Sequence, residues 1–324
     1  MSARKKGMPV KPQIAVLLAA YNGVHWIEEQ IESIRRQTAV DLTIYISVDP
    51  SSDGTEQWCA VCAAKYSEVV LLPTSEVFGG AARNFFRLVR DVSFEGYDYI
   101  AFSDQDDVWD TDKLEHSVRM LKSQGVDAYS SNVTAFWPDG KSLLLDKAQS
   151  QVEWDYLFEA AGPGCTYLMS RKVADPLKEL MIQSWERLQS VTLHDWYVYA
   201  FARSRGYKWF IDPRSTLRYR QHESNQVGAN TGIKSLVSRY KKINNGWWFS
   251  QITLITTLIG LEAHPFFSRW RTLGGLELLS LSMSAWKCRR RIRDKFLFFG
   301  VCWINAVIGL SPRYADAAAT AAKK

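Results

Sequence analysis

The chain of 324 residues is poor in cysteine, has no long hydrophobic run and contains no internal repeat or low-complexity tract. Its five cysteines are an odd number without framework spacing, which excludes a disulfide-stapled secreted domain and favours a reducing compartment. Two apolar stretches, 252–261 and 296–310, are shorter than the roughly twenty residues that a membrane-spanning helix needs. The basic N-terminus leads into a short apolar run, so we expect no signal peptide.

The composition is that of a folded chain whose charge is unevenly distributed. With 47% hydrophobic and 13% aromatic residues, a substantial core can form. Residues 1–231 hold 25 Lys and Arg against 30 Asp and Glu, a net charge of −5, whereas residues 232–324 hold 15 against 4, a net charge of +11. We therefore predict a domain over 1–231 and a basic region over 232–324 that faces an anionic partner, either nucleic acid or a phospholipid surface.

Strands and helices alternate in the first half of the chain. Residues 13–20 form a continuous apolar run, which is typical of a strand buried on both faces. Such alternation predicts an α/β fold with a parallel sheet. Further strands are expected over 42–48, 69–72, 97–102, 128–136 and 209–211. Helices are expected over 24–37, 56–65, 81–92, 112–123 and 175–189, with another from 193.

Carboxylates gather where the strand at 97–102 ends. Asp104, Asp106, Asp107 and Asp110 follow it within a few residues. Open α/β sheets bind their ligands at strand ends, and clustered oxygen ligands suit Mg²⁺ or Mn²⁺, which in turn suit a diphosphate. The alternative is an acidic helix start, which accounts for the later carboxylates but not for Asp104 and Asp106.

Several short blocks occur in a fixed order: VLLAAYNG, VDPSSDGT, FSDQDDVW, PGCT with HDW, and YRQH. Together they resemble the inverting family-two glycosyltransferases over residues 14–225, about two-thirds of the chain. The variants SDQDDVW, GCT, HDW and YRQH look most like the bacterial rhamnosyltransferase branch of cell-surface polysaccharide synthesis. The resemblance implies a GT-A type, Rossmann-like mixed sheet with helices on both faces, followed by a helical C-terminal region. Pro50 and Ser51 depart from the family, which usually has an acidic or glycine pair there.

The resemblance implies roles for residues at the donor end of the site. Ala20, Tyr21 and Asn22 would line the nucleobase of a nucleoside diphosphate sugar, and Asp49 would accept a hydrogen bond from the base. Arg83 would lie near the diphosphate, since a cation in the first turn of a helix is otherwise slightly unfavourable. Without the resemblance, Tyr21 is a buried aromatic residue, Asp49 a turn former and Arg83 a solvated charge.

The same resemblance assigns the metal and the chemistry. Asp106 would bind the metal, and Asp104 would contact the ribose or the metal, with both side chains on one side of an extended segment. His222 would complete the metal or diphosphate site. Asp195 would be the general base, because a carboxylate beside an apolar tryptophan gains proton affinity. The alternative for Asp195 is a helix N-cap, and His194 either orients it or lies in solvent.

Three of the cysteines are interpreted as packing residues. Cys59 and Cys62 form a CxxC within a predicted helix, without a second pair or paired histidines, so helix packing is favoured over a zinc or redox site. Cys165 of the PGCT block has no expected base partner and is predicted to pack below the acceptor pocket rather than act as a nucleophile.

The basic region centres on KCRRRIRDK, which has six cations in the nine residues 287–295. Cations interleaved with tryptophan and phenylalanine suit a helix in the membrane interface. This favours peripheral attachment to the cytoplasmic face of the inner membrane, where a lipid-linked acceptor would lie. The alternative is a helical subdomain packed on the catalytic core with a solvated basic face.

We therefore expect a metal-dependent glycosyltransferase of the hexosyltransferase class. It would move a sugar from a nucleoside diphosphate sugar, dTDP-L-rhamnose by the branch resemblance, to a saccharide acceptor with inversion. Two other classes are weighed. A nucleotide-sugar phosphohydrolase or nucleotidyltransferase would share the metal cluster, but the HDW block and the acceptor-side loop favour transfer. A nucleic-acid-binding protein would use the basic region, but the acidic cluster would repel phosphates and we expect no nucleic acid partner.

Overall fold

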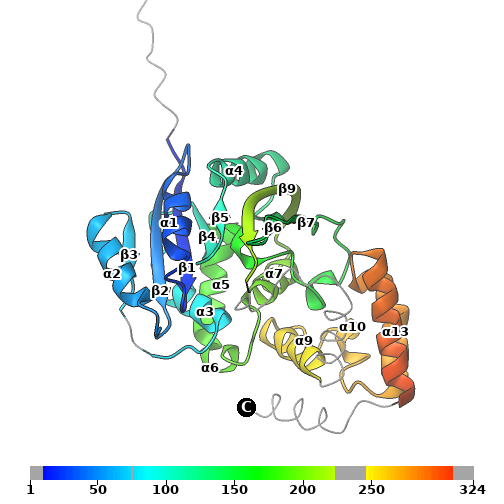
Figure 1. Cartoon of the computed structure of the whole chain (residues 1–324). Helices are drawn as coiled ribbons and strands as arrows, with labels where there is room; N and C mark the ends of the chain where they lie inside the picture. Colours follow the sequence, from blue (N-terminus) through cyan, green and yellow to red (C-terminus); the bar gives the residue numbers. More distant parts are fainter. Residues whose placement is uncertain (1–9, 74–75, 223–245, 309–324) are drawn as a thin grey trace, which may run out of the picture.

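The computed structural model describes residues 10–73, 76–222 and 246–308 (Figure 1). Its framework is a nine-stranded sheet in the order β3-β2-β1-β4-β8-β6-β9-β5, with β7 paired to β6. The predicted boundary between residues 231 and 232 lies outside the described residues, as do residues 1–9 of the basic N-terminus.

The first four strands run parallel, as the alternating pattern predicted. Strand β1 pairs with β2 on one side and β4 on the other, so that Ala20 lies opposite Val48 and Ala19 lies opposite Asp104. The carboxyl ends of three strands therefore meet at one edge of the sheet. The four parallel strands are β1 Gln13–Ala20, β2 Asp41–Val48, β3 Val69–Leu71 and β4 Tyr99–Asp104.

The second half of the sheet is mixed, which confirms the GT-A type topology implied by the resemblance. Strand β8 is antiparallel to both β4 and β6, whereas β9 is parallel to β6 and antiparallel to β5. Strand β9 extends well beyond the predicted residues 209–211, and the sequence pattern did not predict the short strands β5 and β7. The strands are β5 Val108–Trp109, β6 Ala128–Phe136, β7 Ser142–Leu145, β8 Leu168–Ser170 and β9 Trp209–Arg220.

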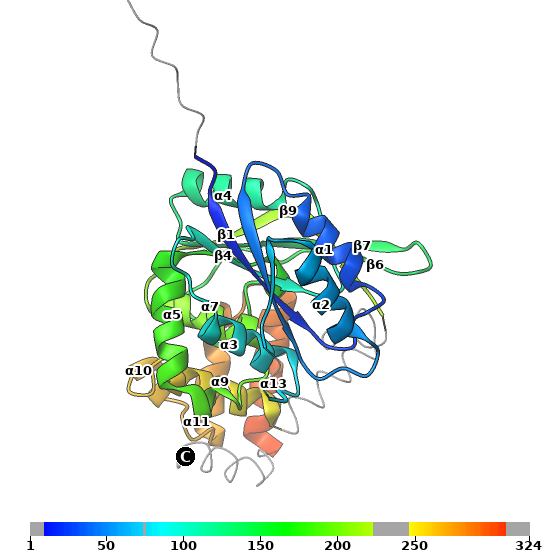
Figure 2. The same ribbon diagram turned by 90° about the vertical axis from the view of Figure 1, so that its left-hand side faces the viewer.

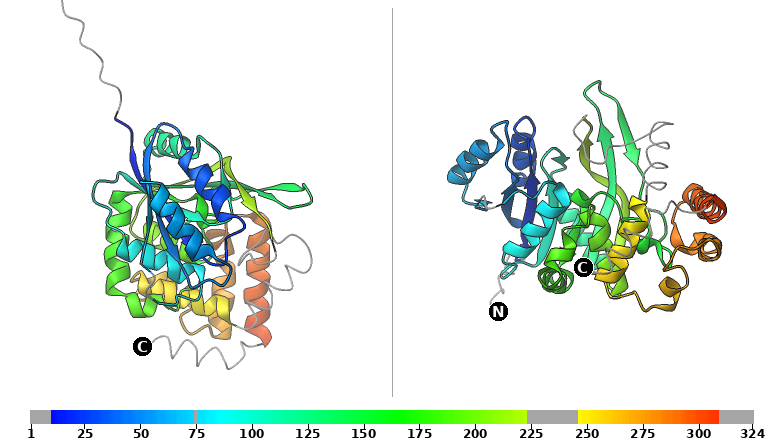
Figure 3. Two further views of the ribbon diagram at one scale, coloured as in Figure 1. Left: turned by 60° about the vertical axis from the view of Figure 1, so that its left-hand side comes forward. Right: turned by 90° about the horizontal axis from the view of Figure 1, so that it is seen from below.

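Helices cover both faces of the sheet (Figures 2 and 3). In β1, Ala15 and Leu17 join the core that holds α3, α5 and α7, whereas Val16 and Leu18 join the core that holds α1, α2 and α4. This confirms a strand buried on both faces. The predicted helix at 175–189 begins earlier and is divided in two. The helices are α1 Ile27–Arg35, α2 Thr55–Lys65, α3 Ala81–Asp91, α4 Lys113–Gln124, α5 Arg171–Gln183, α6 Trp185–Leu188 and α7 His194–Ser204.

The C-terminal region is helical and packs on the rest of the protein. Phe249, Ile252 and Trp270 are buried in the same hydrophobic core as α3, α5 and α7. Among the described residues, no helix combines the length and the apolar character needed to cross a membrane. The helices are α9 Trp247–Leu258, α10 Pro265–Ser268, α11 Gly275–Met283, α12 Ala285–Cys288 and α13 Ile292–Ile308.

Much of the KCRRRIRDK run faces the protein, not solvent. Arg290 is buried and pairs at 3.1 Å with Asp155, which also pairs with Arg203 at 3.1 Å. Arg289 lies 3.5 Å from Glu159. This part of the region therefore packs on the core, because Arg289 and Arg290 neutralise acidic residues of the preceding domain, whereas the side chain of Arg293 is 60% exposed. Attachment to a membrane stays a prediction. Lys287 and Arg291 pair likewise with Glu153 and Asp146.

Candidate active site

The side chain of Gln105 joins the end of β4 to the loop after β1. Its Oε1 accepts from the backbone N–H of Tyr21 at 2.8 Å, and its Nε2 donates to the carbonyl of Tyr21 at 2.7 Å. A Cβ atom on Gly23 would lie 2.0 Å from Gln105 Oε1, so any side chain there would displace this amide. The ring of Tyr21 is 56% exposed, which rules out the alternative of a buried aromatic residue.

A second set of hydrogen bonds ties the loop after β1 to the loop after β2. Asn22 has a φ of 46°, donates its backbone N–H to Ser51 Oγ at 3.0 Å and accepts from the N–H of Ser52 at 2.9 Å. Asp53 accepts from the N–H groups of Val24 and Thr55, both at 3.0 Å. Asp53 therefore shapes the turn before α2, and Ser51 contributes directly to the loop despite its departure from the family pattern.

Asp49 lies buried at the end of β2 and holds the segment before α3. Its two carboxylate oxygens each accept a backbone N–H, from Phe78 and Gly79, at 2.7 Å. Arg83, at the start of α3, donates to the carbonyls of Gln189 and Phe78 at 2.8 and 3.3 Å. Arg83 is thus an exposed cation whose guanidinium is held by two backbone carbonyls.

Asp106 and His222 meet directly. His222 Nε2 lies 2.7 Å from Asp106 Oδ2, and the imidazole ring stacks on Trp26 at a centroid distance of 4.0 Å. Asp104 lies beside them, partly exposed at the end of β4. Burial, together with the charges of Asp106 and Asp195, raises the pKa of Asp104 to about 7. Three carboxylates therefore share one anionic region, and a cation there would relieve their repulsion.

A buried polar cluster lies under these carboxylates. Asp104, Asp107 and Cys165 each place one ligand atom within 4.8 Å of the others. Burial raises the pKa of both Asp107 and Cys165 well above their usual values. Lys113 is fully buried nearby, its Nζ 3.6 Å from the centre of the Trp109 ring, and burial lowers its pKa to about 8. Cys165 is therefore a protonated thiol at neutral pH and a poor ligand for a hard cation.

Asp195 lies in the first turn of α7. The helix begins at His194 with Leu193 at its N-cap position, so Asp195 is not the N-cap of the alternative interpretation. Its Oδ1 accepts from the N–H of Trp196 at 2.8 Å. Burial raises its pKa to about 6, although the charge of Lys147 opposes this shift. A carboxylate with this proton affinity is suited to general base catalysis near neutral pH.

The PGCT and HDW blocks touch each other beside Asp195. The ring of His194 stacks on Phe85 at 4.0 Å, and a Cβ atom on Gly164 would lie 2.3 Å from its Nε2. Burial lowers the pKa of His194 to about 3, so this ring is neutral. His194 therefore packs against the core and does not lie in solvent, and a role in orienting Asp195 stays a prediction.

The chain is similar to several bacterial glycosyltransferases. It is 44% identical to the "dTDP-rhamnosyl transferase RfbG" of Shigella flexneri over 289 residues, which cover 89% of this chain and 99% of that protein. The family model "Glycosyl transferase family 2" matches residues 15–161. The chain belongs to glycosyl transferase family 2. The transferase is also 26% identical to an Escherichia coli "UDP-Glc:alpha-D-GlcNAc-diphosphoundecaprenol beta-1,3-glucosyltransferase WfgD" over 167 residues, half of this chain and 62% of that protein.

A solved structure shares the fold. The crystal structure of Staphylococcus aureus TarS 1-349 in complex with UDP superimposes with a TM-score of 0.55. The match covers 96% of the transferase and 90% of that chain at 11% identity. Such a likeness shows the GT-A fold alone. The membership in the family shows that the protein is a glycosyltransferase, and this confirms the predicted enzyme class.

The donor set of the transferase fits a divalent cation. Asp104 and Asp106 offer carboxylate oxygens and His222 an imidazole, which are ligands for Mg²⁺ or Mn²⁺. Burial is the main cause of the raised pKa of Asp104, and the charges of Asp106 and Asp195 add to it, so a bound cation would lower that pKa. The structure thus brings the predicted metal-binding residues together, but it groups Asp104 with Asp107 and pairs Asp106 with His222.

Sequence reasoning missed several residues of the transferase site. The sequence pattern predicts no role for Gln105, which lies between Asp104 and Asp106. Its amide, however, can both accept from a backbone N–H and donate to a backbone carbonyl. Lys113 was assigned to a helix start, and Trp26 was not considered. The available signal for Lys113 was its position in the first turn of a helix, after the carboxylates at 104–110. A cation there is unfavourable for the helix dipole, which indicates another role.

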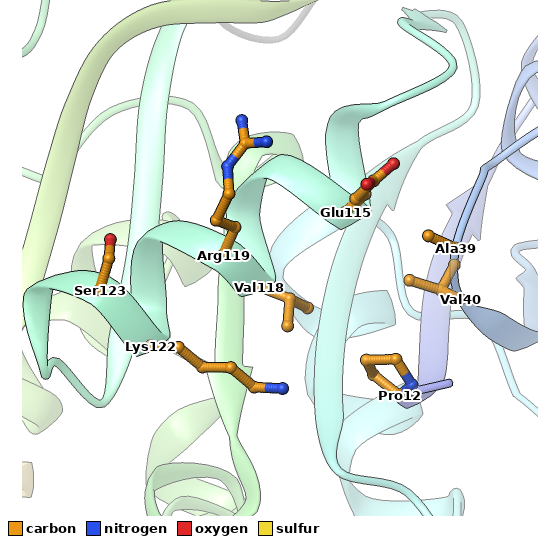
Figure 4. A pocket seen from close by; sticks show the side chains of 8 residues that line it. All are labelled: Pro12, Ala39, Val40, Glu115, Val118, Arg119, Lys122 and Ser123. Carbon is orange, nitrogen blue, oxygen red and sulfur yellow. The ribbon is translucent and has the colours of Figure 1, made fainter. Parts of the chain in front are cut away.

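A surface hollow elsewhere on the transferase is unrelated to these groups (Figure 4). It lies between α4 and the start of β1, and its lining includes Pro12, Val40, Val118 and Arg119. The carboxylates lie at the other, carboxyl end of the parallel strands. We therefore assign no part of the reaction to this hollow.

Proposed function

We propose that the transferase moves a sugar from a nucleoside diphosphate sugar to a hydroxyl of a saccharide acceptor, in one displacement that inverts the anomeric carbon. The observation that supports this most strongly is that Tyr167 links Asp195 to β4: its hydroxyl donates to the carbonyl of Asp195 at 3.3 Å, and its carbonyl accepts from the N–H of Phe102 at 3.2 Å. The proposed base therefore lies near the strand that ends in Asp104, and its charge contributes to the raised pKa of Asp104. Such proximity lets a nucleophile and a leaving group be held in line.

In this proposal Asp195 removes the proton of the attacking hydroxyl. Its pKa of about 6 leaves it ionised at neutral pH yet basic enough to accept a proton as the new bond forms. Trp196 fixes the carboxylate through its backbone N–H, and the neutral His194 ring packs beside it. The base is therefore held by a short, rigid stretch at the start of α7.

Asp104, Asp106 and His222 are the residues that would hold a divalent cation. When bound, Mg²⁺ or Mn²⁺ would neutralise the charge that develops on the departing diphosphate. The His222–Asp106 contact and the stacking of His222 on Trp26 would keep these ligands in place before a cation arrives. Asp104 is proposed to contact either the ribose or the metal.

Residues from three loops are proposed to bind the nucleotide. Ala20, Tyr21 and Asn22 would line the base, and the exposed ring of Tyr21 is available to stack on it. The proposed hydrogen bond from the base to Asp49 would use a lone pair that the backbone N–H groups leave over, since a carboxylate can accept several hydrogen bonds. Arg83 is placed near the diphosphate in this proposal.

The donor that we propose is dTDP-L-rhamnose, on the strength of the 44% identity to the Shigella protein named as a dTDP-rhamnosyl transferase. The proposed acceptor is lipid-linked, because the Escherichia coli relative is named for a diphosphoundecaprenol substrate. The product would enter cell-surface polysaccharide such as O-antigen. An enzyme with this acceptor would work in the cytoplasm, attached peripherally to the anionic inner face of the membrane.

A donor screen tests this proposal. Nucleotide release is measured with several nucleoside diphosphate sugars, with Mg²⁺, with Mn²⁺ and with chelator. We expect dTDP-L-rhamnose to be used and a saccharide acceptor to accelerate release. Release of nucleoside monophosphate and sugar phosphate would instead indicate a phosphohydrolase, and incorporation of the nucleotide into a product would indicate a nucleotidyltransferase. Either result would overturn the proposed reaction.

A further inference from the structure

Large apolar side chains lie exposed along one side of the C-terminal helices. They are each at least 50% exposed and form what we call the apolar face. Its residues are Leu276, Trp286, Ile292, Phe296, Trp303 and Val307. Contiguous exposed apolar surface of this kind is rare on soluble monomers and marks a site of interaction.

Helix α13 is apolar on two opposite sides. Its buried side contributes Phe298 and Cys302 to the core, whereas residues 292, 296, 303 and 307 form a stripe on the other side at helical spacing. After Lys295 the described part of this helix carries no charged residue. A helix with a single partner would be polar on its outer side, so the outer side of α13 is suited to a second apolar environment.

The apolar face is continuous across the helices. The rings of Trp286 and Phe296 meet edge to face with centroids 5.4 Å apart. A Cβ atom on Gly275 would lie 2.9 Å from the carbonyl of Ala306, so the start of α11 packs closely against the end of α13. Leu276 is therefore near the far end of the same stripe. Helix α13 lies at the outer edge of the molecule, away from β3 and α2 (Figures 1 and 3).

Cations border the apolar face. Residues 246–308 contain eight Lys and Arg against three Asp and Glu. Several of the arginines pair with the catalytic domain, but Arg293 beside Ile292 has a side chain that is 60% exposed, and Arg269 and Arg271 before α11 are exposed. Such a border complements an anionic surface. In a twofold dimer built on this face, the same cations would approach one another and oppose association.

We propose that the apolar face of α11, α12 and α13 is the surface that binds an anionic lipid bilayer. This rests on the proposed attachment to the membrane and identifies the side chains that carry it. The face lies in the bilayer interface with α13 parallel to the membrane plane, because the described part of α13 is too short and too charged at its start to cross it. Trp286 and Trp303 suit the headgroup level. The attachment thus depends on apolar residues, while much of the KCRRRIRDK run serves internal packing.

Binding to vesicles tests the proposal with the full chain and without substrates. Wild-type protein is sedimented with vesicles of phosphatidylglycerol and phosphatidylethanolamine, and with vesicles of phosphatidylcholine alone. The test variant combines Phe296→Glu with Trp303→Glu. The control combines Val61→Glu with Ile182→Glu, which are exposed apolar residues of α2 and α5. We expect wild type and control to bind the anionic vesicles and the test variant to bind roughly tenfold more weakly or worse.

Two outcomes would overturn the proposal. Wild-type protein could remain in the supernatant with anionic vesicles, or the test variant could bind as well as the control. Light scattering after size exclusion is the second measurement: a wild-type dimer that the test variant disperses would assign the face to a second copy of the chain. Nucleotide release from the donor is measured in parallel and should be equal in all three proteins, so loss of vesicle binding is distinguishable from failure of the proposed reaction.

Discussion

His222 Nε2 and Asp106 Oδ2 lie 2.7 Å apart, although 116 positions separate these residues in the sequence. Asp106 follows the end of β4, and His222 follows the end of β9. Arg220, two residues earlier, donates from its side chain to the carbonyl of Asp106 at 2.9 Å. The YRQH block thus contacts both the side chain and the backbone carbonyl of Asp106. The proposed metal site therefore lies where two distant segments of the chain meet.

Loss of this pair should weaken metal binding. Asp106→Ala is expected to abolish metal-dependent binding of nucleotide, and His222→Ala to weaken Mn²⁺ affinity roughly tenfold or more, since each removes a ligand or its support. Titration calorimetry with Mn²⁺ and a nucleoside diphosphate measures both. The control is His25→Ala, an exposed histidine next to Trp26. Nucleotide binding that survives both chelator and Asp106→Ala would refute the metal site.

The rate of transfer should fall as acid protonates the base. Asp195 acts only when ionised, and its pKa is raised to about 6, so kcat/KM should drop about tenfold per unit of pH below that value. Rates are measured at saturating Mg²⁺, which keeps Asp104 ionised. Lys147 lowers the pKa of Asp195, so Lys147→Gln should move the acid limb to higher pH. An acid limb that is unchanged in Lys147→Gln would argue against Asp195 as the titrating group.

The loop after β1 should not tolerate a side chain at Gly23. In Gly23→Ala the new Cβ atom would meet Gln105 Oε1 at 2.0 Å, so the amide must give up its hydrogen bonds to Tyr21. Two such bonds are together worth about 1–3 kcal/mol of stability. We expect a lower free energy of unfolding in denaturant and a higher KM for the donor. In the control Gly300→Ala nothing lies within 4 Å of the new atom, so the free energy of unfolding should not fall and KM for the donor should not rise.

The ion pairs that join the C-terminal helices to the catalytic domain should contribute strongly to stability. Arg290 and Asp155 are both buried, so Arg290→Ala leaves a carboxylate that keeps its ion pair with Arg203 and its hydrogen bond from Tyr199 but loses one of its two cations. We expect a loss of about 3 kcal/mol in the free energy of unfolding. Arg293→Ala, whose guanidinium is exposed and pairs with adjacent Asp294, should cost less than about 0.5 kcal/mol. Equal losses in the two variants would contradict the packing role of Arg290.

Local sequence pattern predicted the elements that depend on burial. The run at 13–20 is β1 with both bounds correct, because seven consecutive apolar residues after Gln13 fit a strand covered on both faces. The strand predicted over 209–211 ends too early, because Pro213 and Arg214 interrupt the apolar pattern of β9. The structure accommodates them in a register shift, where Asp212 lies opposite Ser131 and Ser215 opposite Asn132. Proline lacks the N–H of a regular ladder and is tolerated at such a bulge.

Contacts between distant segments could not be predicted in this way. The sequence shows six cations at 287–295, but not that Arg289 and Arg290 pair with acidic residues. Their partners Glu159 and Asp155 lie more than a hundred positions away in the sequence. The order of motifs predicted Asp104, Asp106, Asp195 and His222 as one group. The order β4-β8-β6-β9 in the sheet sets which of these residues touch. That order depends on three-dimensional packing, not on local sequence pattern.

The central claim is that Asp195 is the base of the transfer reaction, and the Asp195→Asn variant tests it most directly. Asparagine keeps the size of the side chain but cannot take a proton at neutral pH. Sugar transfer from dTDP-L-rhamnose and the affinity for dTDP are measured side by side. We predict that turnover falls about 10³-fold while nucleotide affinity stays close to that of the wild type. Wild-type turnover in Asp195→Asn would contradict the account and require another base.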